Sequence, residues 1–147
     1  VKEGEKVLVL FSGVGPYPLV IAKHAKPSLI IGVEKNPLAH AYAVENCKKY
    51  LNIRLYNADA HAFTSTEKFD RVLMPLPKSA EAFLDVAFTF VKKGGVIHFY
   101  DFAQEKEFPQ SSIAKIRKKI KCFTVLNAVK CGQSAPGKYR VCIDIRV

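Results

Sequence analysis

Short apolar runs that alternate with helical patterns constrain the fold of this chain more than any other feature. These runs have the length and β-branching of buried strands, and each is followed by a turn and by residues with helical spacing. Strands joined through helices run parallel with right-handed crossovers, so we expect a parallel sheet with helices on both faces. The expected strands are Lys6–Phe11, Ser28–Glu34, Ile53–Asn57, Asp70–Met74 and Gly95–Phe102.

The pattern changes near the C-terminus. A helix is expected over Ser111–Lys121, and two further strands, CFTVLNAVKCG and YRVCIDIRV, follow with only a short loop between them. That loop is too short for a parallel crossover, which predicts an antiparallel hairpin at the end of a mostly parallel seven-stranded α/β sheet. An amphipathic helix is expected over Lys78–Lys92, ended by Gly94 and Gly95. We expect residues 1–147 to form a single domain.

The composition narrows the class of protein. Apolar residues make up 49% and charged residues 24%, which is typical of a globular domain, and no apolar run approaches the roughly 20 residues of a membrane span. Lys and Arg outnumber Asp and Glu by 23 to 13, so a polyanionic partner is favoured. The four cysteines lack CxxC spacing, which argues against zinc and predicts reduced, mostly buried thiols of an intracellular protein. They are Cys47, Cys122, Cys131 and Cys142.

The stretch LFSGVGPY, Leu10–Tyr17, joins the first strand to the first helix. Its two glycines allow a tight turn and a close backbone approach to a ligand at the start of a helix. Position 18 is Pro18, so the dinucleotide pattern GxGxxG is absent, and no GK[ST] follows as in a Walker A loop. An ordinary strand-to-helix connection remains the alternative interpretation.

Two acids follow strands on the same side of the predicted sheet. Glu34 ends the second strand about twenty residues after the glycines, where a carboxylate can accept the hydroxyls of a ribose. Asp59 follows the third strand, where it would either border an adenine or cap a turn at Ala60–Phe63. A solvated surface glutamate is the alternative for Glu34.

The stretch FDRVLMPLPKS runs from a strand directly into Pro75 and Pro77. Proline fixes φ and removes a backbone donor, so the chain here is stiff and leaves the sheet. We interpret Pro75–Pro77 as a rigid ledge that holds a substrate still, with a simple edge turn as the alternative.

Several stretches together resemble the archaeal and eukaryotic type of tRNA (guanine-37, N1) methyltransferases, within the class I S-adenosylmethionine-dependent methyltransferases. The stretches are FSGVGPY, VEKNPLAHAYAVENCKKYLN, DRVLMPLPKSAEAFLDVAF, KKGGVIHFYDF and SAPGKYRVCIDIRV, which span nearly the whole chain. The resemblance implies a Rossmann-like fold, S-adenosyl-L-methionine as cofactor and methyl transfer to N1 of a guanine next to the anticodon.

The resemblance also implies roles for residues of this chain. Glu34, with Lys35 beside it, would take the ribose hydroxyls, and Asp59 with Ala60 would border the adenine. Pro75, Leu76 and Pro77 would form the catalytic ledge where the methyl donor meets the guanine, with Pro75 also touching the cofactor. The methionine end of the cofactor would be wrapped by Phe11, Ser12, Gly13, Val14, Gly15 and Pro16.

Two positions depart from the family pattern. Val9 stands where an acid usually begins the glycine motif, and Pro75 replaces the Asn of Asn-Leu-Pro. Proline has no side-chain donor or acceptor, so the carbonyl of Leu76 or another group would have to contact the base. The family carries its tRNA-docking region and a catalytic arginine and acid upstream of the glycine motif, so we expect this chain to be a catalytic core without that region.

Deprotonation of guanine N1 calls for a base, and Asp101 at the end of the fifth strand is the candidate within this chain. His98 is expected to pack in the sheet. The densest basic run, KIRKKIK, would face RNA phosphates or form a solvated helix face. Its cations are Lys115, Arg117, Lys118, Lys119 and Lys121.

Two other functions compete with methyl transfer to tRNA. Aminocarboxypropyl transferases that use the same cofactor on a modified tRNA guanine are similar around the glycine turn, but they lack Pro-Leu-Pro. A non-catalytic module that binds the cofactor or RNA is the other alternative. We expect a cytoplasmic monomer with tRNA as partner, without a metal and without a membrane.

Overall fold

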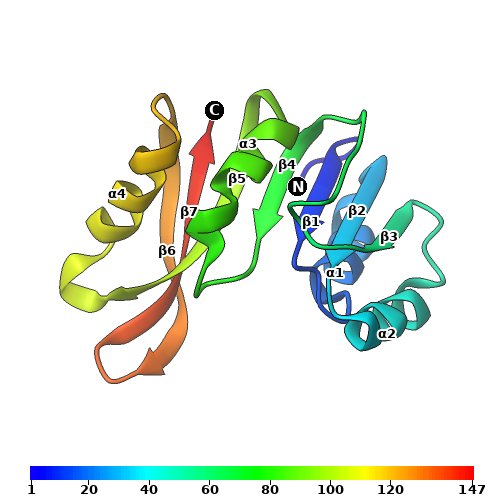
Figure 1. Ribbon diagram of the computed structural model, residues 1–147, viewed down its shortest axis with the longest axis horizontal. Helices are drawn as coiled ribbons and strands as arrows, with labels where there is room; N and C mark the ends of the chain where they lie inside the picture. The colour runs from blue at the N-terminus through cyan, green and yellow to red at the C-terminus, as the bar shows by residue number, and fades with distance from the viewer.

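The computed structural model describes all residues, Val1–Val147, and contains one seven-stranded mixed sheet (Figure 1). The strand order is β3-β2-β1-β4-β5-β7-β6. Strands β1 to β5 run parallel, and β7 pairs antiparallel with both β5 and β6, which confirms the predicted parallel sheet with a terminal hairpin. The strands are β1 (Lys6–Leu10), β2 (Leu29–Glu34), β3 (Ile53–Asn57), β4 (Phe69–Met74), β5 (Val91–Gln104), β6 (Thr124–Ala135) and β7 (Lys138–Arg146).

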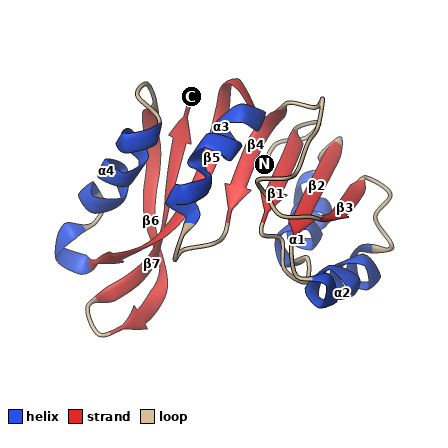
Figure 2. Cartoon of the chain, viewed as in Figure 1, coloured by secondary structure: helices blue, strands red, loops and turns tan.

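Helices cover both faces of the sheet (Figure 2). The local sequence explains where the second helix begins, because Pro37 occupies its first turn and the side chain of Asn36 caps it. Asn36 Oδ1 accepts hydrogen bonds from the backbone of Leu38 at 2.9 Å and of Ala39 at 3.2 Å. The helices are α1 (Pro16–Ala25), α2 (Pro37–Cys47), α3 (Leu84–Phe90) and α4 (Gln110–Lys119), with short 3-10 helices η1 (Ala80–Phe83) and η2 (Glu105–Glu107).

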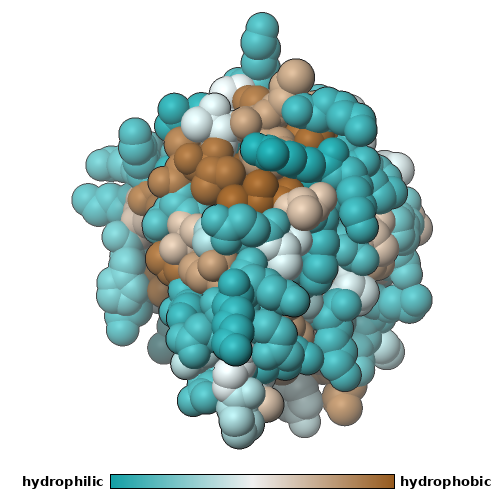
Figure 3. Space-filling view, turned by 90° about the vertical axis from the view of Figure 1, so that its left-hand side faces the viewer, coloured by the Kyte–Doolittle hydropathy of each residue, from teal (hydrophilic) through white to brown (hydrophobic).

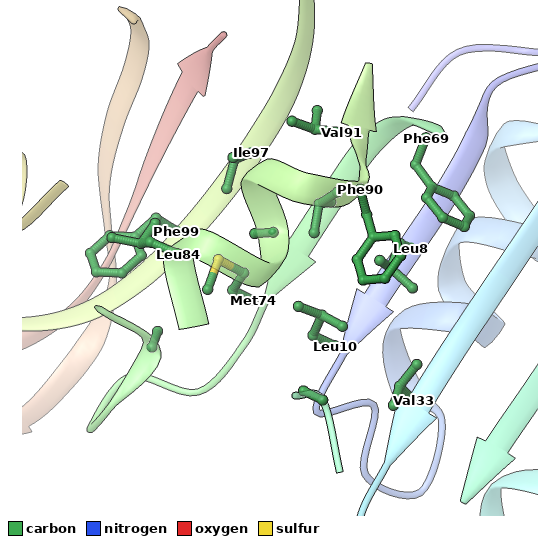
Figure 4. Close-up of a cluster of buried hydrophobic side chains, with 14 of the residues drawn as sticks. Leu8, Leu10, Val33, Phe69, Met74, Leu84, Phe90, Val91, Ile97 and Phe99 are labelled. Carbon is green, nitrogen blue, oxygen red and sulfur yellow. The ribbon is translucent and has the colours of Figure 1, made fainter. Parts of the chain in front are cut away.

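The alternation of side chains along β1 divides the core into two layers. Leu8 and Leu10 point into a cluster of 21 buried residues between the sheet and α3 and α4 (Figure 4). Val7 and Val9 point to the opposite face, where they pack against Ile21 of α1 in a smaller cluster. Val9, the position where the family pattern has an acid, is therefore part of the core and fully buried.

The predicted helix over Lys78–Lys92 is shorter than expected. After Phe90 the chain is extended, and Val91 already pairs with Phe69 of β4. Gly94 and Gly95 lie within β5 and so do not end the helix. Gly94 has φ 79°, and a Cβ on Gly95 would lie 2.7 Å from Val91 Cγ2, so the glycines allow the strand to bend where its register with β4 shifts.

Strands β5, β6 and β7 continue past the carboxyl ends of the other strands. Met74, the last residue of β4, pairs with Phe99, and β5 runs on for Tyr100–Gln104. At about 3.3 Å per residue this continuation reaches roughly 16 Å beyond the rim of the sheet. We call it the strand extension. It consists of Tyr100–Gln104, Val129–Ala135 and Lys138–Cys142.

Two further sequence predictions can be compared with the structure. None of the helices is long and apolar enough to cross a membrane. All four cysteines are free, but only Cys47 and Cys142 are buried, so the prediction of mostly buried thiols was wrong for Cys122 and Cys131. Cys122 follows α4 and Cys131 lies on the edge strand β6, where no element covers them.

Candidate active site at the carboxyl rim of the sheet

The glycine turn between β1 and α1 has a backbone that few residues adopt. Phe11 has φ 58°, Gly13 has φ 56° and Gly15 has φ 87°, all in the left-handed region. A non-glycine residue in this region is uncommon and often marks a functional site. A Cβ on Gly15 would lie 3.0 Å from the Sγ of Cys47 in α2, so a glycine here also permits close packing. The turn is thus fixed against α2.

Glu34 faces this turn from the end of β2. Its Oε2 accepts the backbone N–H of Gly13 at 2.8 Å, and its Oε1 accepts the backbone N–H of Asn36 at 2.8 Å. The side chain is half-buried. Each carboxylate oxygen accepts two hydrogen bonds, so both oxygens keep capacity for a ligand hydroxyl. The predicted proximity of Glu34 to the glycine turn is therefore present in the structure.

Asp59 follows β3 on the same rim and caps a turn, which was one of its two predicted roles. Its Oδ1 accepts the backbone N–H of His61 at 2.9 Å. Its Oδ2 lies 2.8 Å from Lys35 Nζ, and the hydrogen bond from Lys35 holds the pKa of Asp59 below its ordinary value. The carboxylate is therefore ionised at neutral pH and tied to Lys35 across the rim.

A cleft of about 210 Å³ lies on this rim of the sheet. Five of the predicted site residues line it, and the members of the glycine turn after Phe11, Glu34, Pro75 and Pro77 lie outside its lining. Four lining residues were missed by the sequence analysis. The predicted residues in the lining are Phe11, Lys35, Asp59, Ala60 and Leu76, and the missed residues are Val33, Ala58, Ser79 and Phe83.

Phe83 is the most informative of the missed residues. Its ring lies 4.8 Å from that of Phe11 in an edge-to-face contact and 4.3 Å from that of His61, stacked at 26°. Val33 and Ala58 adjoin Glu34 and Asp59 in sequence, which was the available signal for them. Phe83 had none, because a 3-10 turn after the prolines aims it at the cleft. The result is an aromatic, apolar slot with an acid beside it, which suits a nucleoside.

The ledge Pro75–Pro77 leaves β4 with its central peptide groups already bonded. Leu76 N–H donates to the carbonyl of Met74 at 2.8 Å, and the Leu76 carbonyl accepts from Ala80 N–H at 3.0 Å. The carbonyl of Pro75 accepts no hydrogen bond from the chain. Hence the carbonyls of Pro75 and Pro77 are the free acceptors of the ledge, whereas the carbonyl of Leu76, the residue considered from sequence, is occupied.

Asp101 has different surroundings from those expected of a general base. It is buried, its Oδ2 accepts a hydrogen bond from the hydroxyl of Ser112 at 2.8 Å, and both of its oxygens lie 2.8 Å from Lys115 Nζ. These contacts join β5 to α4 and engage both oxygens of the carboxylate. The structure thus places Asp101 in a structural ion pair.

The cations of the basic run KIRKKIK have different surroundings in the structure. Lys115 pairs with Asp101 and Lys119 pairs with Asp85 at 3.0 Å, so two of its cations are neutralised. Helix α4 runs back along the sheet toward the start of β6, where Thr124 pairs with Arg146 (Figure 1). The remaining cations, Arg117, Lys118 and Lys121, are exposed and lie toward the amino ends of the parallel strands, away from the cleft.

A second polar group crosses β4, β5 and β7. Arg71 joins Glu5 at 2.7 Å and His98 Nε2 at 3.2 Å, and His98 Nδ1 lies 2.7 Å from Asp144 Oδ1. Burial alone would raise the pKa of Asp144, but the hydrogen bond and charge of His98 outweigh it, so this pKa lies below its ordinary value. Burial raises the pKa of the neighbouring Cys142 thiol. His98, Cys142 and Asp144 are close enough to ligate a metal, yet these contacts already account for them.

Comparison with known proteins identifies a family model and relatives that match nearly the whole chain. The family model described as the TRM5/TYW2 methyltransferase domain matches residues 1–126. A tRNA (guanine(37)-N(1))-methyltransferase Trm5b from Pyrococcus abyssi is 36% identical over 99% of this chain and 45% of that protein. A tRNA(Phe) (4-demethylwyosine(37)-C(7)) aminocarboxypropyltransferase from Methanocaldococcus jannaschii is 32% identical over 98% of this chain and 60% of that protein.

A solved structure shares the fold. The structure of M. jannaschii TYW2 in complex with AdoMet has a TM-score of 0.90 and 32% identity, over 99% of this chain and 69% of that one. The chain spans about half the length of the curated relatives described above.

Proposed function

The chain belongs to the TRM5/TYW2 methyltransferase domain family, and from this premise we propose that it is the catalytic core of an S-adenosylmethionine-dependent tRNA methyltransferase. The proposed target is N1 of a guanine next to the anticodon, as in the Trm5b relative's name. With a tRNA substrate, we propose that the protein works in the cytoplasm.

The observation that carries this proposal is the arrangement of Glu34 and the aromatic slot. An acid held by the amide of the glycine turn lies beside a cleft lined by Phe11 and Phe83. A nucleoside needs an apolar surface for its base and an acceptor for its ribose hydroxyls, and the cleft provides both. We propose that the glycine turn holds the methionine end, Glu34 the ribose, and Asp59 with Phe83 the adenine.

When bound, S-adenosylmethionine supplies a methyl carbon on a sulfonium, which is the electrophile of the reaction. The chain's own contribution is then mainly positioning, because well-oriented reactants gain roughly 7–11 kcal/mol over free ones. The ledge is suited to this task. Two prolines fix its backbone, and Leu76 is bonded at both peptide groups, so a base plane resting on it would not shift.

Pro75 bears on how the ledge would contact the target guanine. A side-chain amide is absent at this position, and the carbonyl of Pro75 is the free acceptor of the ledge that lies nearer to β4, the carbonyl of Pro77 being the other. We propose that the carbonyl of Pro75 accepts an N–H from the edge of the guanine. Asp101 holds Ser112 and Lys115, so the proposal gives it the role of anchoring α4 and not that of the base.

Transfer of an aminocarboxypropyl group is the second candidate, because relatives of that type are nearly as similar in sequence. The two reactions break different bonds to the same sulfur. Methyl transfer leaves S-adenosylhomocysteine, whereas aminocarboxypropyl transfer leaves methylthioadenosine. The ledge Pro75–Pro77 favours methyl transfer, since the resemblance implies that aminocarboxypropyl transferases lack Pro-Leu-Pro.

The co-product therefore tests the proposal. The protein is incubated with S-adenosylmethionine and unmodified tRNA transcripts, and chromatography with mass spectrometry identifies both the nucleosides and the co-product. We expect 1-methylguanosine together with S-adenosylhomocysteine. Methylthioadenosine would show the second candidate, and calorimetry without detectable cofactor binding would leave only a non-catalytic module.

A further inference from the structure

The strand extension begins where the ledge leaves the sheet. Met74 pairs with Phe99, so Pro75 turns away from β4 at the level where β5 continues as Tyr100. The ring of Tyr100 lies 5.8 Å from that of Tyr17, which follows the glycine turn in α1. The extension therefore lies next to the ledge and next to the glycine turn. It is on the side of the ledge opposite to the cleft between β1, β2 and β3.

One face of the extension combines aromatic and basic side chains. Side chains alternate along a strand, and because Asp101 points to α4, Tyr100 and Phe102 point to the opposite face. On the paired strand β7, Lys138 and Arg140 share that face and are exposed. Lys138 Nζ lies over the ring of Phe102, 5.4 Å from its centre.

The charge on this face has no internal partner. Neither Lys138 nor Arg140 has a carboxylate within 4.0 Å. The face behind it differs, because Lys130 there pairs with Glu105 at 2.7 Å and lies over the ring of Tyr139. Figure 3 looks onto the side of α4 and the hairpin, and its lower part, where the extension lies, is largely hydrophilic, while an apolar patch lies higher up.

We propose that this face of the strand extension binds the single-stranded RNA that flanks the target nucleotide. The inference rests on the proposed function, because the RNA is the proposed substrate. Tyr100 and Phe102 lie about 7 Å apart along the strand, and aromatic residues in such an arrangement on a sheet stack bases of single strands. Lys138 moves from the ring of Phe102 to a phosphate when a base takes its place, and Arg140 contacts a second phosphate.

This surface replaces the α4 run as the site of RNA contact near the reaction. Arg117 and Lys118 are also unpaired, but they lie toward the other end of the sheet. A flexible loop of RNA with one nucleotide at Pro75 places its neighbours over β5, because β4 lies between β1 and β5 and the proposed cofactor cleft occupies the β1 side. Arg117 with Lys118 and Lys138 with Arg140 carry equal charge, so the two pairs of residues are matched for an experiment.

The experiment measures binding of a labelled anticodon stem-loop RNA and of a fully paired RNA of equal length by fluorescence anisotropy over a salt series. We expect the double variant Lys138→Ala/Arg140→Ala to bind the stem-loop about tenfold more weakly, with a salt slope reduced by about 1.4, at roughly 0.7 per phosphate contact. Phe102→Ala should weaken stem-loop binding at least about fivefold, and Phe102→Tyr should restore it. The control double variant Arg117→Ala/Lys118→Ala should change it less than twofold.

Equal effects of the two double variants, or a loss confined to the α4 pair, would overturn the inference, as would equal binding of the stem-loop and the paired RNA. Calorimetry with S-adenosylmethionine and thermal unfolding of each variant separate these outcomes from damage to the fold. The proposed function fails separately, when the wild-type protein binds RNA through the extension but transfers no group to it.

Discussion

The hydroxyl of Ser12 is buried in the glycine turn without a hydrogen-bond partner. The residue is 3% exposed, and its side chain packs against Gly32, where a Cβ would lie 3.1 Å from Ser12 Oγ. A buried polar group without a partner costs about 1–3 kcal/mol of stability. A stability cost of this size can be measured with a single substitution of Ser12.

We expect Ser12→Ala to raise the free energy of unfolding by about 1 kcal/mol, because alanine removes the buried hydroxyl that has no partner. Ser112→Ala is the matched control, since that serine is equally buried but donates to Asp101. It should lower stability by roughly 1.5–3 kcal/mol. Chemical denaturation measures both, and a destabilised Ser12→Ala would mean that the hydroxyl has a partner.

Glu34→Ala should weaken binding of S-adenosylmethionine by about 1.5–3 kcal/mol, the range for hydrogen bonds to a charged group. The cause would be loss of the acceptor for the ribose and of the bonds that fix the turn. Calorimetry measures the change, with Glu45→Ala as control, because Glu45 is exposed on α2 and pairs only with Lys48. An unchanged dissociation constant would refute the role of Glu34.

Single residues differ in how far sequence predicts them. Glu34 and Asp59 were found because each ends or follows a strand, and parallel strands bring such positions to one rim. Asp101 also ends an apolar run, but its surroundings depend on how α4 packs, which no local pattern states. Phe83 was missed because a turn of 3-10 helix, and not a periodic pattern, directs its ring into the cleft.

Helix α4 is attached to β5 by a mostly buried ion pair. The side chain of Asp101 is 6% exposed and that of Lys115 is 34% exposed, and Ser112 completes the contact. Lys119 makes a comparable pair with Asp85, but both of its members are exposed. The two lysines thus offer one buried and one surface pair on the same helix.

We expect Lys115→Met to lower the free energy of unfolding by roughly 2 kcal/mol, because it leaves a buried carboxylate with one hydroxyl as its partner. Lys119→Met should change it by less than about 1 kcal/mol, as is usual for a surface pair. Urea unfolding of both variants provides the comparison. Equal effects would show that the buried pair contributes no more than the exposed one.

The boundary between α3 and β5 shows where prediction of elements fails. Helical spacing over Lys78–Lys92 was read from apolar positions alone, but Phe90 and Val91 are also suited to a strand. Pairing of Val91 with Phe69 decides the outcome, and that pairing depends on the position of β4 in the sheet. Tertiary contacts therefore set the end of this helix, whereas the cap Asn36–Pro37 sets the start of α2 from local sequence.

Three carboxylates away from the cleft form ion pairs with basic side chains of the sheet. Burial alone would raise the pKa of each, but hydrogen bonds from a basic partner outweigh it, so all three pKa values lie below their ordinary range. The pairs are Glu5 with Arg71, Asp70 with Lys92 and Asp144 with His98. Carboxylates with a lowered pKa in the folded state stabilise it at neutral pH and lose this effect on protonation.

The free energy of unfolding should therefore be steady above the ordinary carboxyl pKa values, 4.5 for Glu and 3.8 for Asp, and should fall as the pH drops through the lowered pKa values. Glu5→Gln should reduce stability at pH 7 and show a shallower fall in acid, because one titrating pair is missing. Thermal unfolding between pH 7 and pH 2.5 measures this. Parallel curves for the two proteins would contradict the assignment.

Most of the sheet could be predicted from sequence, because the alternation of strands and helices specifies parallel pairing and the short final loop specifies a hairpin. The strand extension could not. Its length depends on the register between Phe99, Met74 and Ile143, and a two-residue period in side chains is satisfied by any even shift. Only the assembled sheet shows that β5, β6 and β7 continue past the ends of the other strands.

The bonds from Gly13 and Asn36 confine Glu34 before any ligand arrives. A receptor group that is already ordered loses little conformational entropy on association. Glu34 should accordingly bind its ligand with little rearrangement of the rim. Substitutions that only increase the mobility of the surrounding loop should therefore reduce affinity for the ligand, although every contact with the ligand remains.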